Sequence, residues 1–155
     1  MPRELANNTI RRIIVVGIVR NDQGEYLICK MPPNRGVFPG QWGLPGGGVE
    51  DGETIDAALR REMKEELGIG IKDIKPLLFK DAVREKTYPD GSNRMVYMVF
   101  LIYECRSDGN AIALNDEFCE YAWVRWSLLP EYALNEETRD TFRLLSPVLA
   151  DNYDD

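Results

Sequence analysis

The sequence predicts one mixed α/β domain, and three observations lead to this prediction. The 155 residues have the usual length of a single domain and contain no internal repeat or linker. The composition, 44% hydrophobic and 29% charged, is that of a globular protein with a substantial core. Segments typical of strands are interspersed with two segments typical of helices. We therefore expect one domain over residues 1–155, with its core between residues 10 and 145.

The first half of the chain is expected to hold two strands, a long loop and a helix. Residues 13–19 form a β-branched run that suits a buried strand, and residues 26–30 follow a turn as its hairpin partner. Residues 31–52 hold seven of the thirteen glycines and four of the nine prolines, which indicates an ordered loop. Residues 54–67 contain neither Gly nor Pro and are followed by Gly68, so they predict a helix.

The second half is expected to hold three strands and a second helix. Residues 77–86 and 94–105 flank a Tyr-Pro-Asp-Gly turn and predict a long hairpin. Residues 121–124 predict a shorter strand, and residues 136–145 predict a helix that ends before Pro147. This order of elements predicts a mixed sheet with helices packed against it.

Acidic residues lie on the apolar face of the first predicted helix, where charged side chains are not expected. At about 100° per residue, Glu62 and Glu66 share the apolar face with Leu59 and Met63, and Glu65 flanks it. Burying unpaired carboxylates is costly, and clustering them adds repulsion. A hard cation such as Mg²⁺ or Mn²⁺ would hold them ionised together. The alternative is a set of salt bridges within the helix, since Arg61 could reach Glu65.

The glycine-rich run before this helix favours a ligand near the backbone. Residues 42–48 deliver the chain to the helix with little side-chain bulk, which allows close approach of a ligand. The run lacks the spacing of a Walker A loop or of a dinucleotide fingerprint. A tight chain reversal without a ligand is the alternative.

The residues from Gly47 to Ile69 resemble the complete Nudix box, Gly-x5-Glu-x7-Arg-Glu-U-x-Glu-Glu-x-Gly-U, in which U is a bulky aliphatic residue. All nine defined positions are met, with Met63 and Ile69 in the U positions. The resemblance implies the Nudix fold, a mixed β-sheet sandwiched between α-helices. It also implies hydrolysis of a nucleoside diphosphate linked to another group.

The same resemblance assigns roles within the box. It implies Mg²⁺ as cofactor, with Mn²⁺ as a substitute, and it places the metal near Gly47 and Gly48. It gives Arg61 the task of orienting the carboxylates and Glu53 a supporting role or a water-mediated one. The implied metal ligands are Glu62, Glu65 and Glu66.

The general base must be an acid, because the sequence contains no histidine. A glutamate of the box is one possibility. The other candidates are Asp116, Glu117 and Glu120 in a later loop, and Glu117 is our choice. An exposed loop acid without a catalytic role is the alternative for Glu117.

Segments outside the box resemble bacterial Nudix nucleoside triphosphatases that act on pyrimidine deoxynucleotides. These segments are residues 35–42, 87–91 and 115–124. We therefore expect hydrolysis of dUTP, dTTP or dCTP to monophosphate and pyrophosphate. An ADP-ribose or nucleotide-sugar pyrophosphatase is the first alternative, and a non-catalytic Nudix module that senses nucleotides is the second. The candidate substrate contacts are Arg20, Lys30 and Arg35 for phosphates, and Phe38, Tyr88 and Tyr97 for stacking on the base.

Charge and cysteine usage limit the partners. A net charge of −7 argues against a nucleic-acid surface, but it allows a small nucleotide whose charge is neutralised by metal ions. Three widely spaced cysteines fit neither a disulfide framework nor a zinc site. The N-terminus lacks a secretory signal, and the longest apolar run, 95–103, is too short to cross a bilayer. We expect a cytoplasmic enzyme with no membrane partner, and the resemblance suggests a homodimer.

Overall fold

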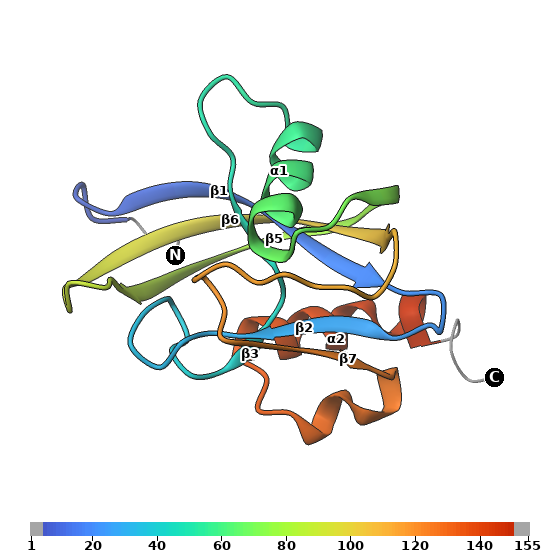
Figure 1. The fold of residues 1–155 in the computed structure, drawn as a ribbon. Coiled ribbons are helices and arrows are strands. Elements are labelled where there is room, and N and C mark those ends of the chain that lie inside the picture. The colour runs from blue at the N-terminus through green and yellow to red at the C-terminus, as the bar shows by residue number, and fades with distance from the viewer. Residues whose placement is uncertain (1–4, 151–155) are drawn as a thin grey trace.

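The computed structural model describes residues 5–150, which form one seven-stranded sheet with a helix on each face (Figure 1). The strand order is β3-β2-β1-β6-β5, with β4 paired to β1 and β7 paired to β2. The helices are α1 (Ile55–Leu67), α2 (Glu136–Leu149) and a 3-10 helix (Trp126–Glu131). The strands are β1 (Ile10–Arg20), β2 (Tyr26–Lys30), β3 (Trp42–Gly43), β4 (Gly46–Gly48), β5 (Ile71–Thr87), β6 (Asn93–Ser107) and β7 (Glu120–Val124).

Alternation along the central strands divides the core into two layers. Val15 of β1 and Leu27 of β2 pack with Leu59 of α1 in one apolar cluster. Ile18 and Ile28, from the same strands, pack with residues of α2 in a second cluster. Since successive side chains of a strand point to opposite faces, α1 and α2 cover opposite faces of the sheet. The predicted mixed sheet between helices is therefore confirmed.

The sheet is mixed because β1 has partners of both directions. It runs parallel to β6 over its whole length, from the pair Ile10–Val96 to the pair Arg20–Arg106, and antiparallel to β4. The expected hairpin between β1 and β2 is confined to the pair Arg20–Tyr26, because β2 pairs mainly with β7. β5 and β6 form the predicted long hairpin, which extends several residues beyond the predicted ends.

The loop predicted at 31–52 contains two short strands that sequence propensity did not indicate. β4 consists only of glycines and forms because it pairs with residues 14–16 of β1. Its pairing requires close approach of the two backbones, since a Cβ at Gly46 would overlap the carbonyl oxygen of Val15. Pairing with an existing strand has therefore overridden the low strand propensity of glycine.

The predicted end of the second helix before Pro147 is wrong, because α2 continues through Pro147 to Leu149. Leu149 is fully buried with Phe142 and Leu145 in the cluster beneath the sheet. Burial of this side chain offsets the backbone hydrogen bond that Pro147 cannot make.

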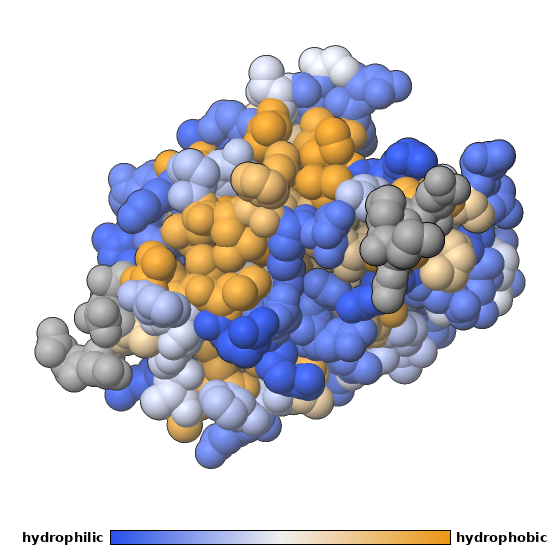
Figure 2. Space-filling model, turned by 180° about the vertical axis from the view of Figure 1, so that it is seen from behind, coloured by the Kyte–Doolittle hydropathy of each residue, from blue (hydrophilic) through white to orange (hydrophobic). Residues whose placement is uncertain are grey.

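The opposite side of the molecule from the view in Figure 1 carries an extended apolar surface (Figure 2). Phe79, on the edge strand β5, is the most exposed of the large apolar side chains described, and it lines a shallow hollow with Leu101. Within residues 5–150, no helix has both the length and the apolar character needed to cross a membrane.

Candidate functional site

A cavity of about 440 Å³ extends from the glycine strand β4 to the first turns of α2. Glu62 and Glu66 of α1 line one end of it, and Glu137 and Thr138 of α2 line the other. Between these ends the walls are mainly apolar and come from β1 and β6, with Leu44 added from the loop before β4. The apolar side chains from the two strands are Ile14, Val16, Val96, Met98, Phe100 and Ile102.

The helical geometry of α1 brings two acids into this cavity. Thr54 caps the helix by accepting a hydrogen bond from the N–H of Ala57, and Gly68 ends it with a left-handed φ of 67°. Glu66 lies on the buried face and is only 2% exposed, as the helical wheel predicted. Ile55, the first residue of the helix, is exposed.

Glu62 and Glu66 form a carboxyl pair. Burial, a hydrogen bond with Glu62 and the charges of Glu62 and Glu117 raise the pKa of Glu66 well above its usual range, while a hydrogen bond from the Gly46 backbone acts in the opposite direction. Two carboxyl groups so close repel each other when both are ionised, and a nearby positive charge reduces that repulsion. A hard cation would supply that charge directly.

The glycine strand leaves room for this pair. A Cβ at Gly47 would lie 2.5–2.6 Å from the carboxyl atoms of Glu62, a distance that real Cβ atoms essentially never show. The absence of a side chain at position 47 is therefore what allows the Glu62 carboxyl to lie against β4. This close approach is the physical reason for glycine at the first position of the box.

Arg61 organises the other carboxylates of the box. Its guanidinium donates to both oxygens of Glu53 at 2.6 and 2.8 Å, to Glu62 at 2.8 Å and to Glu65 at 3.1 Å. It also donates to the carbonyl oxygen of Gly48 at 2.9 Å, which ties α1 to β4. The paired Arg61 lowers the pKa of Glu53 to about 2 and keeps it ionised. The resemblance gave Arg61 this role of orienting the acids.

The predicted ligands do not form a preassembled three-acid metal site. In the described part of the chain, no three acidic, His or Cys side chains converge closely enough to hold a metal ion. Glu65 points away, with its side chain 55% exposed and bound to Arg61. The residues nevertheless fit a divalent cation, because Glu62 and Glu66 line the same end of the cavity and a metal ion would compensate their combined charge.

The loop after β6 carries Glu117 into the same cavity. The N–H groups of Ala113 and Asn115 donate to the last carbonyl groups of α1, at Leu67 and Glu66, which fixes this loop beside the helix end. Glu117 lines the cavity close enough to raise the pKa of Glu66. Asp116 pairs at 3.7 Å with Arg35, and Glu120 pairs at 3.3 Å with Lys30. Of the three loop acids considered, only Glu117 lines the cavity.

Three cations line the cavity near the acids, and sequence reasoning identified only one of them. Arg35 was expected there, and one of its buried guanidinium nitrogens has no hydrogen-bond partner in residues 5–150. Arg12 passes over Gly48, where a Cβ would overlap its guanidinium. Burial, followed by the nearby charges of Arg12 and Arg35, lowers the pKa of Lys86, while Glu117 raises it. Arg12 and Lys86 are basic residues within strands, and no local pattern distinguishes them from other basic residues.

The predicted substrate contacts divide into two groups. Arg35, Phe38 and Tyr88 line the cavity, as expected of substrate-binding residues. The other three do not line it, because each has another partner in the fold. Arg20 pairs with Glu104, Lys30 pairs with Glu120, and the hydroxyl of Tyr97 donates to Asp81 at 2.6 Å.

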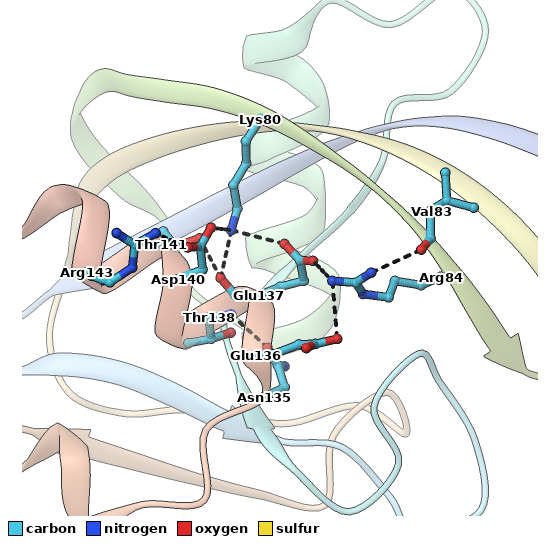
Figure 3. Close-up of polar contacts among 10 residues, drawn as sticks. All are labelled: Lys80, Val83, Arg84, Asn135, Glu136, Glu137, Thr138, Asp140, Thr141 and Arg143. Atoms are coloured by element: carbon cyan, nitrogen blue, oxygen red, sulfur yellow. Dashed lines mark hydrogen bonds and ion pairs between the residues drawn. The ribbon is translucent and has the colours of Figure 1, made fainter. Parts of the chain in front are cut away.

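The far end of the cavity is built by α2 and β5 (Figure 3). Lys80 donates to the Glu137 carbonyl oxygen at 2.9 Å and to Asp140 at 3.1 Å, and it pairs with the Glu137 carboxylate at 3.0 Å. Arg84 pairs with Glu137 at 2.5 Å and with Glu136 at 3.2 Å. Sequence reasoning missed this network, because its members lie more than fifty residues apart along the chain.

Comparison with known proteins supports one family. Residues 10–145 match the NUDIX domain family. The chain is 54% identical over 136 residues to the nucleoside triphosphatase NudI of Salmonella arizonae, a match that covers 86% of this chain and 96% of that protein. It is 53% identical, with the same coverage, to the protein of the same name from Salmonella agona.

Solved structures agree with the sequence comparison. The MutT protein from Methanosarcina mazei Go1 superposes with a TM-score of 0.72 at 25% identity, over 92% of this chain and 97% of that one. The MutT NUDIX hydrolase from Burkholderia pseudomallei superposes with a TM-score of 0.69 at 26% identity, over 86% and 96% of the two chains.

Proposed function

The chain belongs to the Nudix hydrolase family, and we propose that it is a magnesium-dependent nucleoside triphosphate pyrophosphohydrolase. In this reaction water attacks a phosphorus atom of the triphosphate and a P–O–P bridge breaks. The products are the nucleoside monophosphate and pyrophosphate. The proposed substrates are pyrimidine deoxynucleotides, namely dUTP, dTTP and dCTP. Relatives called nucleoside triphosphatases, at 53–54% identity, support this proposal.

The observation that carries the proposal is the charge arrangement of one cavity. The carboxyl pair of Glu62 and Glu66, which suits a divalent cation, lies in the same cavity as Arg12, Arg35 and Lys86. Three clustered basic side chains repel one another, and a polyphosphate would neutralise them. The cavity therefore offers acids for a metal ion and bases for phosphate oxygens.

The residues act in distinct roles in the proposed reaction. Bound Mg²⁺ would neutralise phosphate charge and lower the pKa of a water molecule. Glu62 and Glu66 would hold it, and Glu65 would join them by leaving Arg61. Glu117, which lines the same cavity, would accept the proton of the attacking water as the proposed general base. Phosphoryl transfer needs little else beyond positioning and charge stabilisation.

A nucleotide panel with product identification tests this function. We expect Mg²⁺-dependent release of pyrophosphate and monophosphate from dUTP, dTTP and dCTP, and no activity after chelation of the metal. The runner-up, an ADP-ribose or nucleotide-sugar pyrophosphatase, would release two monophosphates from ADP-ribose and no pyrophosphate. Activity confined to ADP-ribose would therefore reject the proposal. Tight nucleotide binding without turnover would favour the sensing module.

The homodimer suggested by the family resemblance stays a prediction. Sedimentation of the purified chain at several concentrations tests it. Substitution of the exposed Phe79 by a charged residue then asks whether the apolar surface around β5 contributes to association.

A further inference from the structure

The α2 end of the cavity holds polar groups whose hydrogen-bonding capacity is unused. Asn135 and Thr138 line the cavity and are 7% and 5% exposed. The Asn135 side-chain oxygen accepts the N–H of Thr138 at 2.8 Å and caps α2, so the amide NH₂ group is left over. Within residues 5–150, neither this NH₂ group nor the Thr138 hydroxyl has a hydrogen-bond partner. Neither group belongs to the fully buried polar atoms without partners, so both are accessible to a polar ligand edge in the cavity.

Glu137 adds a fixed acceptor at the same end (Figure 3). Lys80 pairs with one oxygen of its carboxylate and Arg84 pairs with the other, which fixes its orientation. Each carboxylate oxygen retains a further lone pair for a ligand. Lys80 uses its three protons on Glu137 and Asp140, so none remains for a ligand. The cavity end therefore presents one group that only accepts and two groups that can donate.

We propose that Asn135, Glu137 and Thr138 bind the Watson–Crick edge of a pyrimidine base. Uracil, thymine and cytosine each present one donor group and two acceptors on that edge. Guanine presents two donor groups and one acceptor, and adenine presents one of each. One acceptor and two donors in the protein therefore match the number of each kind of group on a pyrimidine edge. They pair with uracil or thymine when the acceptor lies between the two donors, and with cytosine when the acceptor lies at one end. This inference rests on the proposed function and assigns its base selectivity to three residues.

The rest of the cavity is consistent with this orientation. The side chains between the two ends are apolar and include Val16, Phe100 and Ile102, which suit the faces of a planar ring. The cations Arg12, Arg35 and Lys86 lie toward the carboxyl pair, where the triphosphate of the same molecule would bind. One nucleotide would therefore satisfy both ends.

Glu137→Gln tests the acceptor, with Glu136→Gln as its matched control. Glu136 is the preceding residue and pairs with the same Arg84, but its side chain is 60% exposed and does not line the cavity. A glutamine at position 137 can donate as well as accept. We expect Glu137→Gln to lower the kcat/KM ratio of dUTP over dGTP by at least about tenfold, because a hydrogen bond to a charged group is lost. Glu136→Gln should leave that ratio within about twofold of the unmodified protein.

Thr138→Val tests the donor without disturbing the ion pairs. It should reduce the same ratio, and Thr138→Ser should restore it, since serine keeps the hydroxyl. If Glu137→Gln does not fold, this pair of variants decides the question. If folded Glu137→Gln and Thr138→Val proteins keep the same ratio of kcat/KM for dUTP over dGTP, the inference is overturned. The ion-pair network would then only hold α2 against β5.

Binding of dUMP and dGMP without added metal separates this inference from the proposed function. We expect dUMP to bind more tightly than dGMP by calorimetry, and Thr138→Val to reduce that preference. A protein that hydrolyses no nucleoside triphosphate but keeps this preference would contradict only the proposed function. A protein that releases pyrophosphate but binds both monophosphates equally would contradict only the inference.

Discussion

The two ends of the cavity differ in the balance between acidic and basic side chains. At the carboxyl end, the carboxylates of Glu53, Glu62 and Glu65 pair with the single guanidinium of Arg61, and the buried Glu66 lies beside Glu62. At the α2 end the charges balance, with three basic residues facing three acidic ones, Lys80, Arg84 and Arg143 with Glu136, Glu137 and Asp140. The unbalanced end is suited to a cation and to chemistry. The balanced end is suited to holding its side chains in one geometry and to selecting the base of the substrate.

The largest effect is expected from Glu66→Gln at the unbalanced end. The change removes a buried carboxyl from the pair that would hold the metal, so kcat should fall by at least about 10³-fold. Without metal the variant should be at least as stable as the unmodified protein, because a neutral amide replaces a buried acid.

Steady-state kinetics checks the loss of kcat, and scanning calorimetry with and without Mg²⁺ checks the stability. The stabilisation that Mg²⁺ gives the unmodified protein should disappear in Glu66→Gln. Unchanged turnover would place the reaction elsewhere in the molecule.

A smaller loss is expected from Gly47→Ala, which adds a methyl group where the Glu62 carboxyl lies. Displacement of that carboxyl should reduce kcat by about 10- to 100-fold, because misplaced groups lose catalytic alignment. Gly17→Ala is the control, since its methyl would meet mainly the flexible side chain of Met63 at 3.1 Å. Equal kcat values for the two variants would argue against a role for the close approach at Gly47.

Arg61→Lys should reduce kcat/KM by about tenfold, because a lysine cannot reproduce the bidentate contact with Glu53. Arg60→Lys on the same helix is the matched control. Arg60 pairs with Asp56 on an exposed surface, so its replacement should have little effect on turnover. Steady-state kinetics of the two variants gives the comparison, and similar losses in both would contradict the role of Arg61.

Lys86→Met should raise KM about tenfold with a smaller change in kcat, because a cation that contacts phosphate in the ground state is lost. Lys30→Met is the control, since Lys30 lies outside the cavity and pairs with Glu120. A larger KM effect at Lys30 than at Lys86 would restore the sequence-based assignment of phosphate contacts.

The smallest effect is expected from Asp140→Asn at the balanced end, outside the cavity. Its partly exposed ion pairs should contribute at most about 1 kcal/mol to the free energy of unfolding. Hydrogen bonds from Arg143 and Lys80 lower the pKa of Asp140. The contribution should therefore be complete at neutral pH and vanish as pH falls through that lowered pKa. Denaturant unfolding at pH 7 and below pH 3 measures it, and a difference that grows in acid would contradict this assignment.

The sequence revealed the unbalanced end because its residues are close together in the chain. Helical periodicity placed Glu62 and Glu66 on the buried face, and the box spacing linked them to Gly47 and Arg61. The helix end at Gly68 followed from local conformation alone. Such features depend on one segment, so a single sequence contains them.

The balanced end and the cation cluster depend on chain segments that meet only in the folded protein. Arg12 and Lys86 come from different strands, and Lys80 reaches Glu137 across 57 positions. Nothing local separates these residues from ordinary surface charges such as Lys30. The continuation of α2 past Pro147 is similar, because it depends on burial of Leu149 against distant strands.

The parallel pairing of β1 with β6 also determines when the protein can complete this cavity during synthesis. β1 leaves the ribosome well before its partner β6, which ends at Ser107. Pairing across so long a stretch of chain has a high contact order and slows folding. Until β6 emerges, the short strands β2 and β4 are the only described strands that can pair with β1. The walls of the cavity are thus among the last parts of the nascent chain to form, and the acids of α1 are made long before they can enclose a substrate.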